Sequence, residues 1–144
     1  MTEEERPRLQ PRKSNVGRLA TGRAKANIER AEWLYAVNQP ELGITVSDVI
    51  REAVTNDALR RISLWQLLLS VPGWGEVHAA RVIRNMHAAH GSTAAERKVK
   101  MNVGTIIDER RGGRLWVALA DAMAREEAGG ESVPAGFPYT ATGL

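Results

Sequence analysis

The sequence predicts a small all-α domain, and two observations support this fold class. Apolar residues recur at spacings of three and four along most of the chain, which is the pattern of one face of a helix. A Pro-Gly turn at residues 71–77 joins two such segments, as in a tight corner between helices. With 144 residues, the chain is long enough for one domain with a modest core and two tails.

The composition divides the chain into four parts. Residues 1–15 contain two prolines, three consecutive glutamates and few apolar side chains, so we expect a flexible basic leader. Residues 16–40 are expected to form a long N-terminal basic helix, and residues 41–127 a helical domain. Residues 128–144 are rich in proline and glycine, which predicts a disordered tail.

The N-terminal helix is predicted from four apolar residues at spacings of four, three and four: Ala24, Ile28, Ala31 and Tyr35. Arg23 and Arg30 fall elsewhere on the same helix and give it a basic face. Such a face either lies along a phosphate strand or is simply solvated. Pro40 and Gly43 mark the end of the helix.

Three short helices are predicted next, each opened by a polar cap: Thr45 before residues 46–54, Asn56 or Asp57 before a segment through Ile62, and Ser63 before residues 64–70. In the third helix, Trp65, Leu68 and Leu69 are expected to point inward. These segments are therefore expected to belong to the core of the domain.

The turn at residues 71–77 has the composition of a backbone anion site. Pro72 fixes its own φ, and Gly73 and Gly75 can adopt positive φ or let another chain approach closely. The next helix resumes near Val77, so free amide hydrogens and the positive end of the helix dipole face outward, where both favour a phosphate oxygen. The turn predicts either a clamp for a nucleic-acid backbone or an ordinary corner between helices.

The helix predicted at residues 76–90 has two faces. Four apolar residues make a stripe that is expected to be buried: Ala79, Val82, Ile83 and Met86. His78, Arg81 and Asn85 fall on a second face that starts beside the turn, where Arg81 is placed to contact the same phosphate. His87 and His90 share a helix face, but nothing else in the sequence completes a ligand set, so we expect no metal.

Residues 92–113 are predicted to be a long loop, which is uncommon in a compact domain and tends to be functional or disordered. Arg97, Lys98 and Lys100 lie within it, where basic side chains suit contacts with a nucleic-acid backbone. The last helix, residues 114–127, presents an apolar face that is expected to pack on the core: Leu115, Leu119, Ala122 and Met123.

Positive charge is concentrated in two segments. The chain has a formal charge of +3 and a pI near 9.7. Residues 6–30 carry eight bases and one acid, residues 97–114 six bases and two acids, and residues 41–95 five of each. Two basic arms thus flank a neutral core, which favours a polyanionic partner. The sequence has no cysteine and no apolar run near the ~20 residues of a membrane span, so we expect a cytoplasmic protein.

Several segments between residues 44 and 123 share the pattern of one known family: VSDVIREA at 46–53, NDAL at 56–59, SLWQLLL at 63–69, the PGWG turn at 72–75, RKVK at 97–100 and LWVAL at 115–119. On these motifs the chain resembles the actinobacterial integration host factor family, small helical nucleoid-associated proteins that bind and bend duplex DNA. The resemblance implies a helix-two-turn-helix motif. It also implies that Pro72 and Gly75 keep the family's Pro-x-x-Gly turn, which helps to hold the DNA backbone.

The basic residues Arg97, Lys98 and Lys100 fall where relatives have an arginine-rich run implicated in DNA contact. The chain departs from the family at the turn, where Gly73, Glu76 and His78 stand in place of the usual lysines. Coulomb attraction at the turn is therefore expected to be weaker. Trp74 adds a ring there, either as a wedge against DNA or as a cap on the core.

We therefore predict a non-enzymatic protein that binds and bends duplex DNA with little base specificity, without a cofactor or metal. The candidate DNA-contacting residues are Pro72, Gly73, Trp74, Gly75, Val77, His78, Arg81, Arg97, Lys98, Lys100, Arg23 and Arg30. The alternatives are a helix-hairpin-helix DNA-processing enzyme and an RNA- or ribosome-associated module. An integrase or another nucleoprotein complex is a further candidate partner, and we expect a monomer associated with the nucleoid.

Overall fold

The computed structural model describes the backbone of residues 11–108, 110 and 113–129, and side chains from residue 21 onward. This part of the chain is predominantly helical, as the sequence predicts. Its helices are α2 (Pro11–Asn38), η1 (Pro40–Leu42), α3 (Val46–Ala53), α4 (Asp57–Arg60), α5 (Leu64–Leu69), α6 (Glu76–His90), α7 (Ala94–Lys98), α8 (Val103–Ile106) and α9 (Arg114–Glu127).

Residues 11–15, which the sequence assigned to the leader, belong to α2. The rest of the predicted leader and the tail from residue 130 onward lie outside the described residues. None of the described helices combines the length and the apolar character that crossing a membrane requires.

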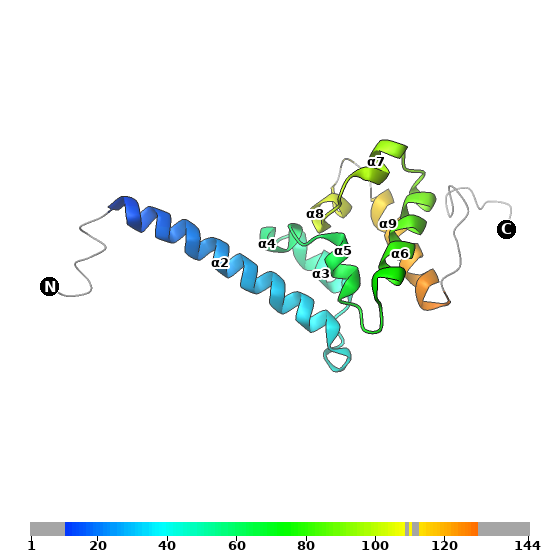
Figure 1. Ribbon diagram of the computed structural model, residues 1–144, viewed down its shortest axis with the longest axis horizontal. Coiled ribbons are helices and arrows are strands. Elements are labelled where there is room, and N and C mark those ends of the chain that lie inside the picture. Colours follow the sequence, from blue (N-terminus) through cyan, green and yellow to red (C-terminus); the bar gives the residue numbers. More distant parts are fainter. Residues whose placement is uncertain (1–10, 109, 111–112, 130–144) are drawn as a thin grey trace.

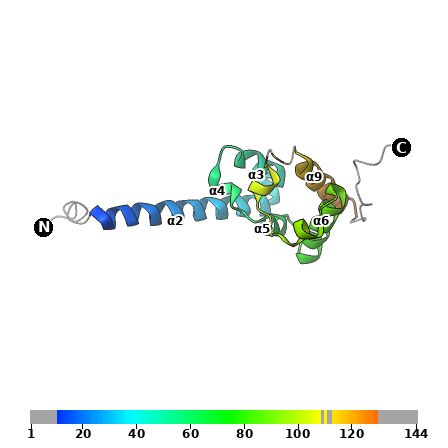
Figure 2. The same cartoon turned by 90° about the horizontal axis from the view of Figure 1, so that it is seen from above.

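α2 projects from the rest of the molecule over its N-terminal half and packs against α4 over its C-terminal half (Figure 1, Figure 2). The apolar face that the spacing predicts is not the face that packs. Its four residues, which we call the α2 stripe, are all exposed: Ala24, Ile28, Ala31 and Tyr35. Packing uses the opposite face, where Trp33 and Leu34 are half-buried and Val37 is buried. These larger side chains bury more apolar area than a stripe that is half alanine.

Three short helices begin at the predicted caps. Thr45 forms a capping box at the start of α3, and Asn56 and Ser63 cap α4 and α5 through their side chains. The prediction for the inward face of α5 is wrong at Trp65, which is 37% exposed. The buried face of α5 follows the i, i+3, i+4 spacing and excludes Trp65; it consists of Leu64, Leu67 and Leu68.

Residues 92–113 are not the long loop that the sequence predicts, because two short helices occupy much of the segment. Thr93 opens α7 and Asn102 opens α8, each through a capping box. Val103 and Ile106 of α8 are buried in the core. The free energy gained by burying these side chains offsets the conformational entropy that the segment loses on folding. Two backbone hydrogen bonds of 2.9 Å tie the segment to the start of α5: Leu64 N to Met101 O, and Val103 N to Ile62 O.

α6 and α9 pack side by side and supply the centre of the core (Figure 1). The buried residues that they contribute include Ala79, Val82, Met86, Leu115, Leu119 and Ala122. Ile83 and Met123 are half-buried at the edge of the core. Asn85, which was expected on an outward face with His78 and Arg81, is buried at 2% exposure. The second face of α6 is therefore not free for a ligand along its length.

Candidate nucleic-acid interface

The glycine turn between α5 and α6 lies at the surface. Trp74 N donates to Val71 O at 3.0 Å, which closes a four-residue turn with Pro72 in its second position. Gly73, in the third position, has a φ of +81°, as a type II turn requires. Pro72, Gly73 and Gly75 are exposed. The turn thus has the conformation that its composition predicts, and it is not packed inside the domain.

The first turn of α6 presents unbonded amide hydrogens beside this corner. Within the described part of the chain, no group accepts a hydrogen bond from the amides of Glu76, Val77 and His78. The next amide, Ala79 N, donates to Gly75 O at 3.0 Å. Val77 is 67% exposed, and a Cβ placed on Gly75 would meet no atom within 4 Å. An anion therefore has room to approach the amides.

A buried carboxylate lies behind the turn. The Glu126 side chain is 1% exposed, and its Oε2 lies 2.6 Å from His78 Nδ1 and 3.1 Å from Arg81 Nη1. The His78 ring stacks with the Trp74 ring at a centroid distance of 6.1 Å, and Trp74 also packs against the core. Of the two roles predicted for Trp74, a wedge against DNA or a cap on the core, its packing matches the cap on the core. Arg81, predicted to contact phosphate, is paired with a carboxylate of the same chain and is 30% exposed.

Glu126 is a residue that the sequence analysis missed, although a signal for it exists. The buried residues Leu115, Leu119 and Ala122 are spaced by four and three, and a further step of four reaches Glu126 on the same face of α9. A carboxylate on a buried stripe requires a hydrogen-bonding or cationic partner from a neighbouring element. Here α6 supplies both partners.

The residues Arg97, Lys98 and Lys100, which we call the basic cluster, are all exposed. Arg97 and Lys98 form the last turn of α7, and Lys100 follows one residue after its C-cap. Arg97 Nε also donates to Ser92 O at 3.3 Å. A capped helix, rather than a long loop, therefore positions the cluster.

The basic cluster borders a pocket of about 580 Å³, whose lining includes Trp65 and His87. His87 is 4% exposed, and its Nδ1 lies 2.7 Å from Ser92 Oγ. Burial lowers the pKa of His87, and the nearby Arg97 and His90 lower it further. The imidazole is therefore mostly neutral at pH 7. Among the described residues, no group of three His, Cys, Asp or Glu side chains is placed to hold a metal ion.

The two basic residues predicted on α2 have different environments. Arg23 is exposed. Arg30 is half-buried, where its Nη1 donates to Ala58 O at 3.1 Å and its Nη2 donates to Asn27 Oδ1. Arg30 therefore fastens α2 to α4, and Arg23 is the one of the pair that faces solvent.

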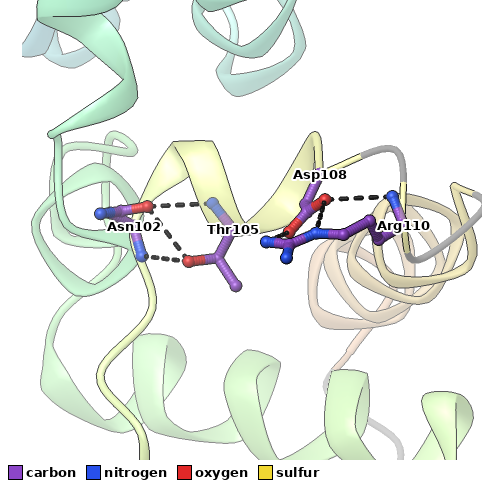
Figure 3. A network of polar contacts seen from close by, with 4 residues as sticks. All are labelled: Asn102, Thr105, Asp108 and Arg110. Atoms are coloured by element: carbon purple, nitrogen blue, oxygen red, sulfur yellow. Dashed lines mark hydrogen bonds and ion pairs between the residues drawn. The ribbon is translucent and has the colours of Figure 1, made fainter.

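One further base of the second basic arm is paired within the chain. Figure 3 shows Arg110 beside Asp108, with Nη2 2.9 Å from Oδ2, and hydrogen bonding to Asp108 raises the pKa of Arg110. The adjacent cap of α8 joins Asn102 and Thr105 through a 2.9 Å bond from the Thr105 amide (Figure 3). The charge of Arg110 is therefore partly balanced within the chain.

The turn and the basic cluster lie beyond opposite ends of α6 (Figure 1). The 15 residues of α6 make it about 22 Å long. The fold therefore does not gather the predicted residues into one site: most of them lie in these two patches, and Arg23 and Arg30 lie apart from both on α2.

No protein-family model, curated protein or solved structure matches this chain. The resemblance to the actinobacterial integration host factor family thus rests on the motifs between residues 44 and 123.

Proposed function

We propose that this protein binds the phosphate backbone of duplex DNA with little base specificity and bends the duplex. The observation that carries the proposal is the exposed glycine turn, beside which the first amides of α6 have no acceptor among the described residues. Backbone amides at a helix N-terminus bind phosphate oxygens without regard to base sequence. In this proposal the turn and α6 act as the clamp of a helix-two-turn-helix motif.

The basic cluster supplies the second contact. Its three exposed cations follow the C-terminal end of α6, whereas the turn precedes the N-terminal end of this helix, which is about 22 Å long. Two contacts separated in this way favour a duplex that bends between them. Smooth bending of a short site costs roughly 1–6 kcal/mol, which the added phosphate contacts offset. An architectural role in a nucleoid or an integrase complex follows from such bending.

The setting of the lysines favours binding over catalysis. A lysine nucleophile is usually activated by removal from water or by a neighbouring cation in a pocket. Lys98 and Lys100 border a pocket beside Arg97, but both side chains are exposed, so water solvates their ammonium groups. This environment supports a role in phosphate contact rather than in the chemistry of a DNA-processing enzyme.

A pair of substitutions at Glu76 tests the clamp. Glu76 is exposed and is the first residue of α6, a position that tolerates proline because its amide has no partner within the helix. Both Glu76→Ala and Glu76→Pro remove the same negative charge, but only Glu76→Pro removes an amide hydrogen. We expect Glu76→Pro to bind a short duplex roughly tenfold more weakly than Glu76→Ala, because a charge-assisted hydrogen bond is lost.

Fluorescence anisotropy with a labelled duplex measures this difference, and circular dichroism checks that both variants keep the native helix content. Equal affinities of the two variants would exclude the turn amides as the phosphate site. Competition by structured RNA in the same assay separates the DNA proposal from an RNA-associated module.

A further inference from the structure

The α2 stripe is an apolar surface that the described helices leave uncovered. Ile28 is 57% exposed and Tyr35 is 65% exposed, and both alanines of the stripe are exposed as well. Val37, at the centre of the packed face, is nine residues from Ile28, which places the two about 180° apart around the helix. The stripe therefore points directly away from the domain, and a partner can reach it without displacing α4.

The α2 stripe lies on the half of α2 that packs against the domain, but on the outward side of that half. Trp33, Leu34 and Val37 cover the inward side. A partner along the stripe would therefore bury apolar side chains that the packed face leaves exposed.

The spacing of the stripe suits pairing with a second copy of the same helix. Intervals of four, three and four are those of the a and d positions of a heptad. When two copies of α2 are laid antiparallel, Ala24 of one copy faces Tyr35 of the other, and Ile28 faces Ala31. Each layer then pairs a large side chain with a small one. A parallel arrangement would instead place tyrosine on tyrosine and alanine on alanine.

Charge supports the same register. Lys25 and Glu32 are exposed and flank the stripe at the e positions of the heptad. In the antiparallel register, Lys25 of each copy lies opposite Glu32 of the other, which gives two opposite-charge pairs. We propose that two copies of this chain associate through antiparallel pairing of their α2 stripes.

The proposed dimer has a defined consequence for function. Because the stripe and the packed face are on opposite sides of α2, the two domains lie on opposite sides of the helix pair. If each domain binds duplex DNA as proposed above, the dimer bridges two duplexes or two distant parts of one. The pairing itself does not depend on DNA and is tested without it.

Analytical ultracentrifugation of the full chain tests the association. The interface is short and half alanine, so we expect the average mass to rise from monomer toward dimer between about 10 µM and about 1 mM protein. Lys25→Glu should shift this rise to at least threefold higher concentration, because two like-charge contacts replace two attractive ones. The double variant Lys25→Glu with Glu32→Lys should restore it. A monomer at every concentration, or a double variant that stays as weak as the single one, would overturn the proposal.

Disulfide cross-linking tests the orientation, since the native chain has no cysteine. Oxidation of an equal mixture of Lys25→Cys and Glu32→Cys chains should give a mixed disulfide in high yield. Each variant alone should cross-link poorly, because in this antiparallel register the two copies of residue 25 lie about 13 Å apart along the axis, and the two copies of residue 32 about 8 Å apart. Cross-linking of each variant with itself, without a mixed product, would overturn the antiparallel arrangement.

Discussion

Folding buries His87 and thereby opposes its protonation. The groups around the imidazole are Ser92, which shares a hydrogen bond with Nδ1, and the charged or titratable side chains of Arg97, His90 and Glu96. Burial, Arg97 and His90 all lower the pKa of His87, and Glu96 opposes them with a smaller effect. The folded protein therefore binds a proton at His87 less readily than the unfolded chain does.

The lowered pKa of His87 predicts loss of stability in mild acid. Below the ordinary histidine pKa of 6.5, the unfolded chain takes up a proton that the folded protein does not. The stabilising contribution is complete above pH 6.5 and declines as pH falls toward the folded pKa, by at most about 1.4 kcal/mol per pH unit.

Urea unfolding between pH 7.5 and pH 5 measures this dependence. His87→Asn keeps a polar atom near Ser92 but has no proton to bind, so its unfolding free energy should fall less steeply with pH than that of the native protein. Parallel profiles for the two proteins would rule out His87 as the source of the pH dependence.

Caps, more than burial, hold α7 in place. Thr93 and Glu96 form a capping box at its start, and none of its five residues is buried. α3 carries a similar box between Thr45 and Asp48, but α3 also buries four of its residues. Without its cap, α3 would still be held by its buried side chains, whereas α7 has no buried side chain to hold it.

We expect Thr93→Ala to release α7 locally. Loss of the cap costs about 1 kcal/mol, which a five-residue helix without buried side chains does not recover. Hydrogen exchange of the α7 amides should accelerate about fivefold or more. Thr45→Ala is the matched control, and exchange within α3 should change less because core packing holds that helix. The opposite order of effects would show that α7 is held by something other than its cap.

At the scale of the whole molecule, the basic cluster should govern the salt dependence of DNA binding. Each phosphate neutralised contributes about −0.9 to the slope of log K against log salt. Replacement of Arg97, Lys98 and Lys100 by alanine should therefore make the slope shallower by roughly 3 if each cation contacts one phosphate. Titrations of a duplex at several salt concentrations measure the slope.

A second triple variant separates contact from net charge. Arg51, Arg61 and Arg84 are also exposed and lie outside both proposed patches. Their replacement by alanine removes the same charge, so the slope should remain close to that of the native protein. Equal changes in the two triple variants would indicate diffuse attraction without a defined cluster.

The sequence by itself determined the features that depend on neighbours three or four residues away. The caps at Thr45, Asn56 and Ser63 and the turn at Gly73 were predictable because one side chain or one φ angle decides each of them. The sequence also contains the Thr93-x-x-Glu96 pattern of the capping box that opens α7. Apolar spacing alone did not predict this helix.

Only the tertiary structure decided which faces are covered and which charges are paired. The α2 stripe has helical spacing, but the core packs against the face with the larger side chains. Glu126 pairs with His78 across 48 positions of sequence, and it also pairs with Arg81, a predicted phosphate ligand, across 45 positions. Local hydrogen bonds are determined within one turn of helix, whereas burial and long-range ion pairs depend on which elements the whole chain brings together.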